Sequence, residues 1–179
     1  FNYVNVHNSS SAVAGGGMLI GSFNANVMLS NCIISQCTSQ TGGGMYFYSG
    51  NDNITVVSSV VEDCEATGGY GGALHMVENH DTVHIVSSQF VNNAASISGG
   101  AFASESNNNN FVLADILFEA NSAGDSGGAV YLVSDHAQLS MIDLQSYNTA
   151  TVAQSEHPYQ SGLPTGGVPY VIFSQSIAS

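Results

Sequence analysis

Gly127-Gly128-Ala129-Val130 is the last of five related tetrapeptides that recur along this chain. The earlier copies are Gly15-Gly16-Gly17-Met18, Gly42-Gly43-Gly44-Met45, Gly71-Gly72-Ala73-Leu74 and Gly99-Gly100-Ala101-Phe102. Their first residues lie 27, 29, 28 and 28 positions apart. A fixed period of about 20 to 50 residues is typical of solenoids and repeat arrays. We therefore expect Gly15, Gly42, Gly71, Gly99 and Gly127 to mark the same corner in successive structural units.

The residues after each glycine pair alternate between apolar and mixed positions, which indicates a strand with one buried face. In the fourth copy, Ala103 is expected on the outward face of such a strand. A second strand begins 12 residues after the first glycine in every copy. Its inward pairs are Val27/Leu29, Ile54/Val56, Val83/Ile85, Phe111/Leu113 and Leu139/Met141.

Each unit reaches an equivalent position 22 residues after its first glycine, and only the spacer that follows varies in length. No helical period competes with this pattern, and no copy has room for a strand–helix unit. The sequence therefore predicts an all-β protein: a parallel β-helix of about five to six coils of about 28 residues. Residues 1–149 are expected to form regular coils of a single domain. Residues 150–165 are expected to form an inserted loop, and residues 166–179 a terminal strand or edge coil.

The charge balance excludes several classes of partner. The chain has 13 acidic residues and no Lys or Arg, so it cannot neutralise phosphates, and we expect no nucleic-acid partner. No apolar run is long enough to span a bilayer, so we expect no membrane insertion. Low charge with abundant Ser, Asn and Gly favours an extracellular or cell-surface location. Asn8 and Asn53 begin two sequons and are candidate N-glycosylation sites.

The paired motifs resemble those of a known family. Gly-Gly-Ala at Gly71, Gly99 and Gly127, preceded by Phe-x-x-Asn at Phe90 and Phe118, is similar to the repeat of polymorphic outer membrane proteins. The resemblance covers roughly residues 1–150 and implies a right-handed parallel β-helix in a surface-exposed, often adhesive protein. Two copies differ from the pattern because they carry Gly-Gly-Gly-Met and a cysteine in place of the asparagine. Such a repeat identifies a scaffold, not an activity.

The equivalent position at the end of each unit suggests a stacked column of side chains. Asn93 and Asn121 are expected to form an asparagine ladder that bonds turn backbone groups, with Cys37 and Cys64 at the equivalent places on earlier coils. Cysteines on adjacent coils lie within disulfide range. We favour the alternative, in which both are free thiols that fill apolar space, and expect Cys32 to be an unpaired core residue. No zinc-binding spacing is present.

Two pairs of aspartates occupy equivalent positions on neighbouring coils: Asp115 with Asp143, and Asp52 with Asp81. Stacked carboxylates can be catalytic acids of a polysaccharide-cleaving enzyme or calcium ligands. We favour solvated surface acids, and hence no catalytic residue, no metal and no cofactor. Catalysis by Asp115 and Asp143 remains one alternative, and calcium binding by Asp52 and Asp81 the other.

Two further columns follow from the repeat. A polar turn column is expected to stack, and it contains Asn24, Asn51, His80, Asn108 and His136. On the outward side of the first strand, Tyr46, His75 and Tyr131 form a candidate strip for stacking on sugars or contacting proteins. We favour ordinary exposed strand aromatics for this strip.

These features favour a non-catalytic extracellular scaffold, either a structural subunit of a filament or fibre or a segment of a surface adhesin. The open ends of a β-helix present unpaired backbone groups, which tend to pair with another chain. The expected partner is therefore a second copy or a longer chain that stacks end to end, with glycans or cell-surface proteins as further candidates. The alternative function is that of a carbohydrate-active enzyme, similar to a glycoside hydrolase, that uses the stacked carboxylates.

Overall fold

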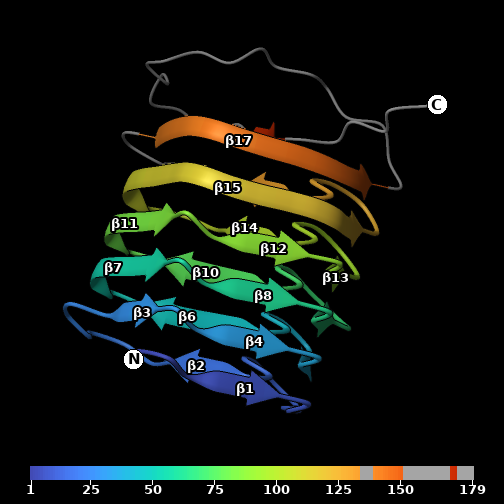
Figure 1. Cartoon of the computed structure of the whole chain (residues 1–179), viewed down its shortest axis with the longest axis horizontal. Helices are drawn as coiled ribbons and strands as arrows, with labels where there is room; N and C mark the ends of the chain where they lie inside the picture. Colours follow the sequence, from blue (N-terminus) through green and yellow to red (C-terminus); the bar gives the residue numbers. More distant parts are fainter. Residues whose placement is uncertain (134–138, 151–169, 173–179) are drawn as a thin grey trace.

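The computed structural model describes residues 1–133, 139–150 and 170–172. The described residues form strands and turns, with no helix among them. The strands wind into a parallel β-solenoid of about five coils with a coil spacing of about 28 residues (Figure 1). The all-β coil architecture predicted from the glycine period is therefore confirmed.

Two sheets build the coils. The larger, 12-stranded sheet contains β1 (Asn5–His7), β3 (Met28–Ser30), β4 (Ile33–Ser35), β5 (Thr38–Ser39), β7 (Asp52–Val57), β8 (Val60–Glu62), β9 (Glu65–Ala66), β11 (Asp81–Val86), β12 (Gln89–Val91), β13 (Ala94–Ala95), β15 (Asn109–Ala123) and β17 (Leu139–Ala150). The smaller, six-stranded sheet contains β2 (Met18–Ile20), β6 (Met45–Ser49), β10 (Leu74–Glu78), β14 (Phe102–Ser104), β16 (Val130–Leu132) and β18 (Tyr170–Ile172).

The strand register follows the sequence frame. In the smaller sheet His75 pairs with Tyr46 on one side and with Ala103 on the other. In the larger sheet Val83 pairs in the same way with Ile54 and Phe111. Two pairings break the pattern. The strand β18 runs antiparallel to β16, and the register of β15 with β17 shifts between Glu119 and Ser122, so that Thr149 pairs with Ser122 and not with Asn121.

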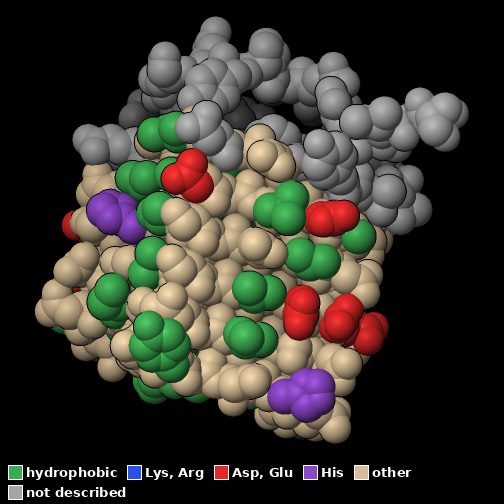
Figure 2. Space-filling model, viewed as in Figure 1, with side chains coloured by type: hydrophobic (Ala, Val, Ile, Leu, Met, Phe, Trp, Pro, Cys, Tyr) green, Lys and Arg blue, Asp and Glu red, His purple; other side chains and the backbone are tan. Residues whose placement is uncertain are grey.

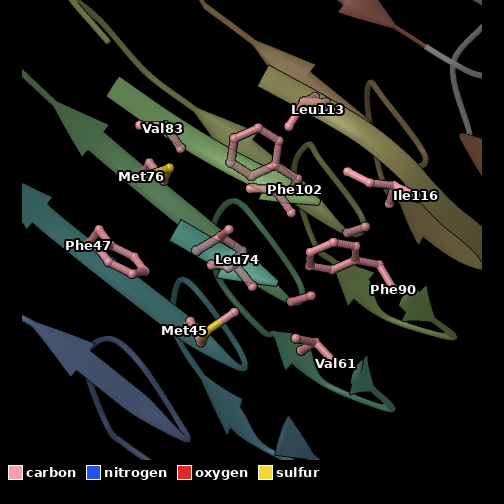
Figure 3. Close-up of a cluster of buried hydrophobic side chains, with 14 of the residues drawn as sticks. Met45, Phe47, Val61, Leu74, Met76, Val83, Phe90, Phe102, Leu113 and Ile116 are labelled. Atoms are coloured by element: carbon pink, nitrogen blue, oxygen red, sulfur yellow. The ribbon is translucent and has the colours of Figure 1, made fainter. Parts of the chain in front are cut away.

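The core lies between the two sheets, where equivalent apolar side chains stack from coil to coil. Figure 3 shows Met45, Leu74 and Phe102 pointing into this space from successive strands of the smaller sheet. From the larger sheet, the rings of Phe90 and Phe118 stack with centroids 5.4 Å apart. Burying each such side chain contributes roughly 1.5–3 kcal/mol before the loss of chain entropy. Since a coil covers only the edges of its neighbours, stability depends on the contacts between coils.

The two glycines of each pair have different tasks. The first glycine has a positive φ, for example +69° at Gly99, which side chains other than glycine rarely adopt. The second glycine lies where coils approach most closely. A Cβ at Gly100 would overlap the carbonyl oxygens of Gly128 on the next coil and of Ser122.

Ala103 is buried, although its outward position in the strand predicted an exposed side chain. It lies on the outer side of β14, as the alternation predicted, yet it is only 1% exposed. The ring of Tyr70 contacts both His75 and Tyr131, the neighbours that flank Ala103 in the sheet. Tyr70 therefore covers the alanine, and the outer face of this sheet has a packed layer of its own.

Candidate functional site

The polar turn column bonds one coil to the next, and its three described members after the exposed Asn24 are buried. Asn51, His80 and Asn108 are each 0% exposed. The Asn24 N–H donates to Asn51 Oδ1 at 3.0 Å, the Asn51 N–H to His80 Nδ1 at 3.1 Å, and the His80 N–H to Asn108 Oδ1 at 2.9 Å. Each side chain thus satisfies a backbone donor of the preceding coil, which is a structural task. His136 lies outside the described residues.

His80 is the one ionisable member of this column among the described residues. Burial lowers the pKa of its imidazole, because the charged form would lose its solvation. The Phe47 carbonyl, 3.4 Å from Nε2, and the Asp52 carboxylate favour the charged form but are outweighed. The bond from the Asn51 N–H requires a lone pair on Nδ1 and hence the neutral ring.

The second column is also a ladder. The Cys64 N–H donates to Asn93 Oδ1 at 3.0 Å, and both the N–H and the Nδ2 of Asn93 donate to Asn121 Oδ1. All three cysteines are buried and free. Burial raises the pKa of the Cys64 thiol to about 12; a hydrogen bond with the Cys37 backbone opposes this rise, and the Cys37 thiol adds to it. Such thiols are poor nucleophiles, so the column carries no reactive cysteine.

The aspartate pairs do not form a recognisable reaction centre among the described side chains. Asp115 is exposed, and it occupies a corner of the coil where φ is 51°. Asp143 belongs to β17, but its side chain lies outside the described part of the structure. Asp52 and Asp81 are neighbours in register, and Asn110 Nδ2 donates to Asp81. In the described ranges no three His, Cys, Asp or Glu side chains converge to hold a metal ion.

Both sequons lie on the surface. Asn8 and Asn53 are exposed and have positive φ values of 52° and 50°. The Asn53 Nδ2 donates to Asn26 Oδ1 at 2.7 Å, on the preceding coil. Figure 2 shows the outer face of the larger sheet, where small groups of hydrophobic side chains alternate with polar ones.

The outer face of the smaller sheet carries the most distinctive arrangement of side chains. Strands β6, β10 and β16 place Tyr46, His75 and Tyr131 in one outward column, and the loop before Gly71 adds Tyr70. The Tyr46 and His75 rings meet edge to face with centroids 5.4 Å apart, and Tyr70 and Tyr131 stack at 6.0 Å, almost parallel. Tyr48 stacks on Tyr46. We call these five residues the aromatic cluster.

His75 joins the aromatic cluster to two polar side chains. Its ring is 3% exposed, with Nδ1 2.6 Å from Thr41 Oγ1 and Nε2 2.9 Å from Glu105 Oε1. The Thr41 hydroxyl also lies 3.1 Å from the Tyr70 carbonyl oxygen. An ionised carboxylate can only accept hydrogen bonds, so the contact with Glu105 requires the hydrogen on Nε2 of His75. The Glu105 carboxylate is therefore held in a fixed orientation, with 37% of the side chain still exposed.

A shallow depression of about 300 Å³ opens beside His75 and Glu105. Its lining combines aromatic rings, a carboxylate, an amide, a hydroxyl and two glycines: Gln40, Thr41, Tyr46, Gly68, Gly69, Tyr70, His75 and Glu105. Burial raises the pKa of the Tyr46 phenol, and the negative charge of Glu105 raises it further. The surface here is aromatic and rich in hydrogen-bond acceptors, and it has no cationic side chain because the chain contains no Lys or Arg.

Sequence reasoning found only part of this depression. Tyr46 and His75 follow from the strand alternation, as does Tyr131 beside them in the aromatic cluster. Thr41 and Tyr70 lie in the spacer of variable length, and Glu105 lies in the polar stretch after β14, so no period points to them. The unusual composition of the spacer before Gly71, Gly68-Gly69-Tyr70, was the one available signal.

Comparisons of the chain with protein-family models, with curated proteins and with solved structures found no match. Within the described ranges, no helix has the length and apolar character needed to cross a bilayer.

Proposed function

We propose that this chain is a non-catalytic structural unit of an extracellular β-solenoid and that it assembles through its N-terminal coil. The main support for this proposal is the location of the exposed apolar side chains. Seven of the ten large hydrophobic residues that are exposed among the described residues belong to the first 33 positions: Phe1, Tyr3, Val13, Leu19, Phe23, Met28 and Ile33.

Their exposure has a simple structural cause. The first coil has a neighbour on one side only, since β2 is the last strand of the smaller sheet and β1 the last strand of one arm of the larger sheet. Leu19 in the edge strand β2 is 56% exposed, whereas its register partner Tyr46, which has strands on both sides, is partly buried. A further coil against this end would cover the apolar side chains and pair the free strand edges.

The opposite end differs from this one. Because β18 pairs antiparallel with β16, it occupies the edge of the smaller sheet where a further parallel coil would add. The N-terminal end therefore suits a partner solenoid, either a second copy or a coil of a longer chain, better than the C-terminal end does. A repeat of the polymorphic-outer-membrane-protein type on a cell surface would be consistent with this arrangement.

Two other features support an extracellular setting. The sequon asparagines Asn8 and Asn53 are both exposed and accessible to modification. The absence of Lys and Arg also removes every cleavage site for trypsin-like proteases, which suits a protein exposed outside the cell.

Sedimentation velocity over a range of protein concentrations tests the proposal. We expect concentration-dependent association that is abolished by Leu19→Glu together with Tyr3→Glu, both exposed on the first coil. Ile142→Glu, which replaces a 49% exposed residue of β17 near the other end, is the matched control and should associate as the wild type does. In parallel, an additional coil copied from residues 56–84, which ends in register with Phe1, and fused before Phe1 should raise the melting temperature. A chain that stays monomeric and gains no stability from the added coil would refute the proposal.

A further inference from the structure

We propose that the depression beside His75 binds one neutral pyranose residue of a glycan. This inference goes beyond the structural role proposed above and does not depend on assembly through the N-terminal coil. It rests on three properties of the lining: its aromatic surfaces, its oriented carboxylate and its lack of positive charge.

The aromatic surfaces provide the apolar part of the site. Tyr46 and Tyr70 both line the depression and both contact the His75 ring, at centroid distances of 5.4 Å and 5.7 Å. They therefore stand on either side of a nearly buried floor. The tyrosines are held in place by their own stacking partners, Tyr48 and Tyr131, so their rings are ordered before a ligand arrives. Ring faces of this kind contact the C–H face of a pyranose, and pre-ordering lowers the entropic cost of binding.

The polar part of the site is suited to hydroxyl groups. Glu105 Oε1 accepts a hydrogen bond from His75, which fixes the carboxylate plane while leaving the side chain partly open to solvent. A fixed carboxylate accepts strong hydrogen bonds from sugar hydroxyls, because one partner is ionised. Gln40 adds an amide that can both donate and accept.

Charge and size restrict the ligand class further. The chain has no Lys or Arg and a formal net charge of −13, so acidic sugars are repelled. The volume of about 300 Å³ lies at the lower end of small-molecule sites, which span roughly 300–1,000 Å³. One sugar ring with its neighbours in solvent fits this size. An organic ammonium ion would also be attracted by aromatic rings and a carboxylate. The sugar is favoured because the Glu105 carboxylate is already bonded to His75, and because Gln40 and Thr41 add polar groups that an ammonium ion does not need.

Titration of the full chain with methyl glycosides of glucose, galactose, mannose and N-acetylglucosamine tests the inference. Backbone amide chemical shifts report where binding occurs, and tyrosine fluorescence reports affinity without interference because the chain has no Trp. We expect at least one neutral glycoside to shift the amides of Tyr46, Gly68 and Gly69. Glu105→Gln should weaken binding by about 10- to 100-fold, the usual cost of losing a hydrogen bond to a charged group. Glu78→Gln, the same change at an exposed position of β10, should leave affinity unchanged.

Three outcomes would overturn the inference. The first is that no neutral glycoside binds, and the second is that shifts occur without involving the depression. The third is that Glu105→Gln binds as tightly as Glu78→Gln. Tyr46→Phe keeps the aromatic ring and should therefore keep most of the affinity for the sugar. Tyr46→Ala removes the ring and should lose most of that affinity. Tetramethylammonium is titrated alongside; saturable binding of this cation in place of the sugars would also refute the proposal. Repeating the titration with the Leu19→Glu, Tyr3→Glu double variant distinguishes failure of this site from failure of the assembly proposal.

Discussion

Replacement of His80 by Asn should change how the stability of the solenoid depends on pH. The neighbouring coils use Asn51 and Asn108 at the same position, so the substituted side chain can still accept a backbone hydrogen bond. What it cannot do is titrate. In the wild type, burial lowers the pKa of His80 in the folded state from an ordinary value of 6.5. The unfolded chain therefore binds a proton more readily than the folded chain just below that pH.

The sign of the effect follows from this difference. The stabilisation by neutral His80 is fully present above pH 6.5, and it is lost progressively as the pH falls from there to the lowered pKa of the folded state. Within that window the slope approaches about 1.4 kcal/mol per pH unit. For a domain of this length, each 1 kcal/mol changes the melting temperature by roughly 2–4 °C. We therefore expect the wild type to lose melting temperature relative to His80→Asn as the pH falls, by at most about 3–5 °C per pH unit.

Thermal melts followed by circular dichroism between pH 8 and pH 5 provide the measurement. His84→Asn, which alters a histidine on the outer face of β11, is the control and should keep the pH dependence of the wild type. The absolute stability of His80→Asn at pH 8 does not matter, since the ring also packs edge to face on Phe47 and its loss has a separate cost. A difference between wild type and His80→Asn that stays constant from pH 8 to pH 5 would refute the reasoning.

Two other predictions concern the coil itself. Gly100→Ala should destabilise the protein by about 3 kcal/mol or more, because the new Cβ meets backbone atoms that cannot move aside. Gly21→Ala is the control and should be almost neutral, because a Cβ there would have nothing within 4 Å. Equal melting temperatures of the two variants would contradict the close approach of coils. At pH 8 the folded protein should resist alkylation by iodoacetamide, because all three thiols are buried and Cys64 in addition has a pKa of about 12. The unfolded protein should be alkylated at all three cysteines. Intact mass with and without reductant tests the Cys37–Cys64 pair, and a mass lower by two hydrogens without reductant would show a disulfide instead of free thiols.

The glycine period predicted the coils, their register and the inward side chains, because each of these repeats with the chain. The third glycines were recognised in the sequence only as departures from the repeat, and the structure explains them. A Cβ at Gly17 would lie 2.8 Å from Ile34 Cγ2 and 3.1 Å from Cys37 Sγ, whereas the coil that has Asn93 at the cysteine position accommodates Ala73. The two departures from the repeat, glycine for alanine and cysteine for asparagine, therefore belong to one local packing solution.

The depression beside His75 could not be predicted in the same way. It depends on side chains that reach across coils, such as Tyr70 from the variable spacer to Tyr131, whose strand lies two coils further along. The burial of Ala103 was missed for the same reason, since the residue that covers it is 33 positions away in the sequence and follows no period. The repeat period determines the course of the backbone, whereas this depression is formed by side chains whose positions do not follow the period.

The ladders give the solenoid a direction. At Asn24, Asn51 and His80 the backbone donor is satisfied by a side chain of the coil that follows in sequence, and Cys64 and Asn93 are satisfied in the same direction. During synthesis the N-terminal coils leave the ribosome first, before the side chains that complete them exist. Ordering of the growing chain must therefore lag about one coil behind its emergence. A nascent chain stalled at any point would present one incomplete coil, always at its newest end.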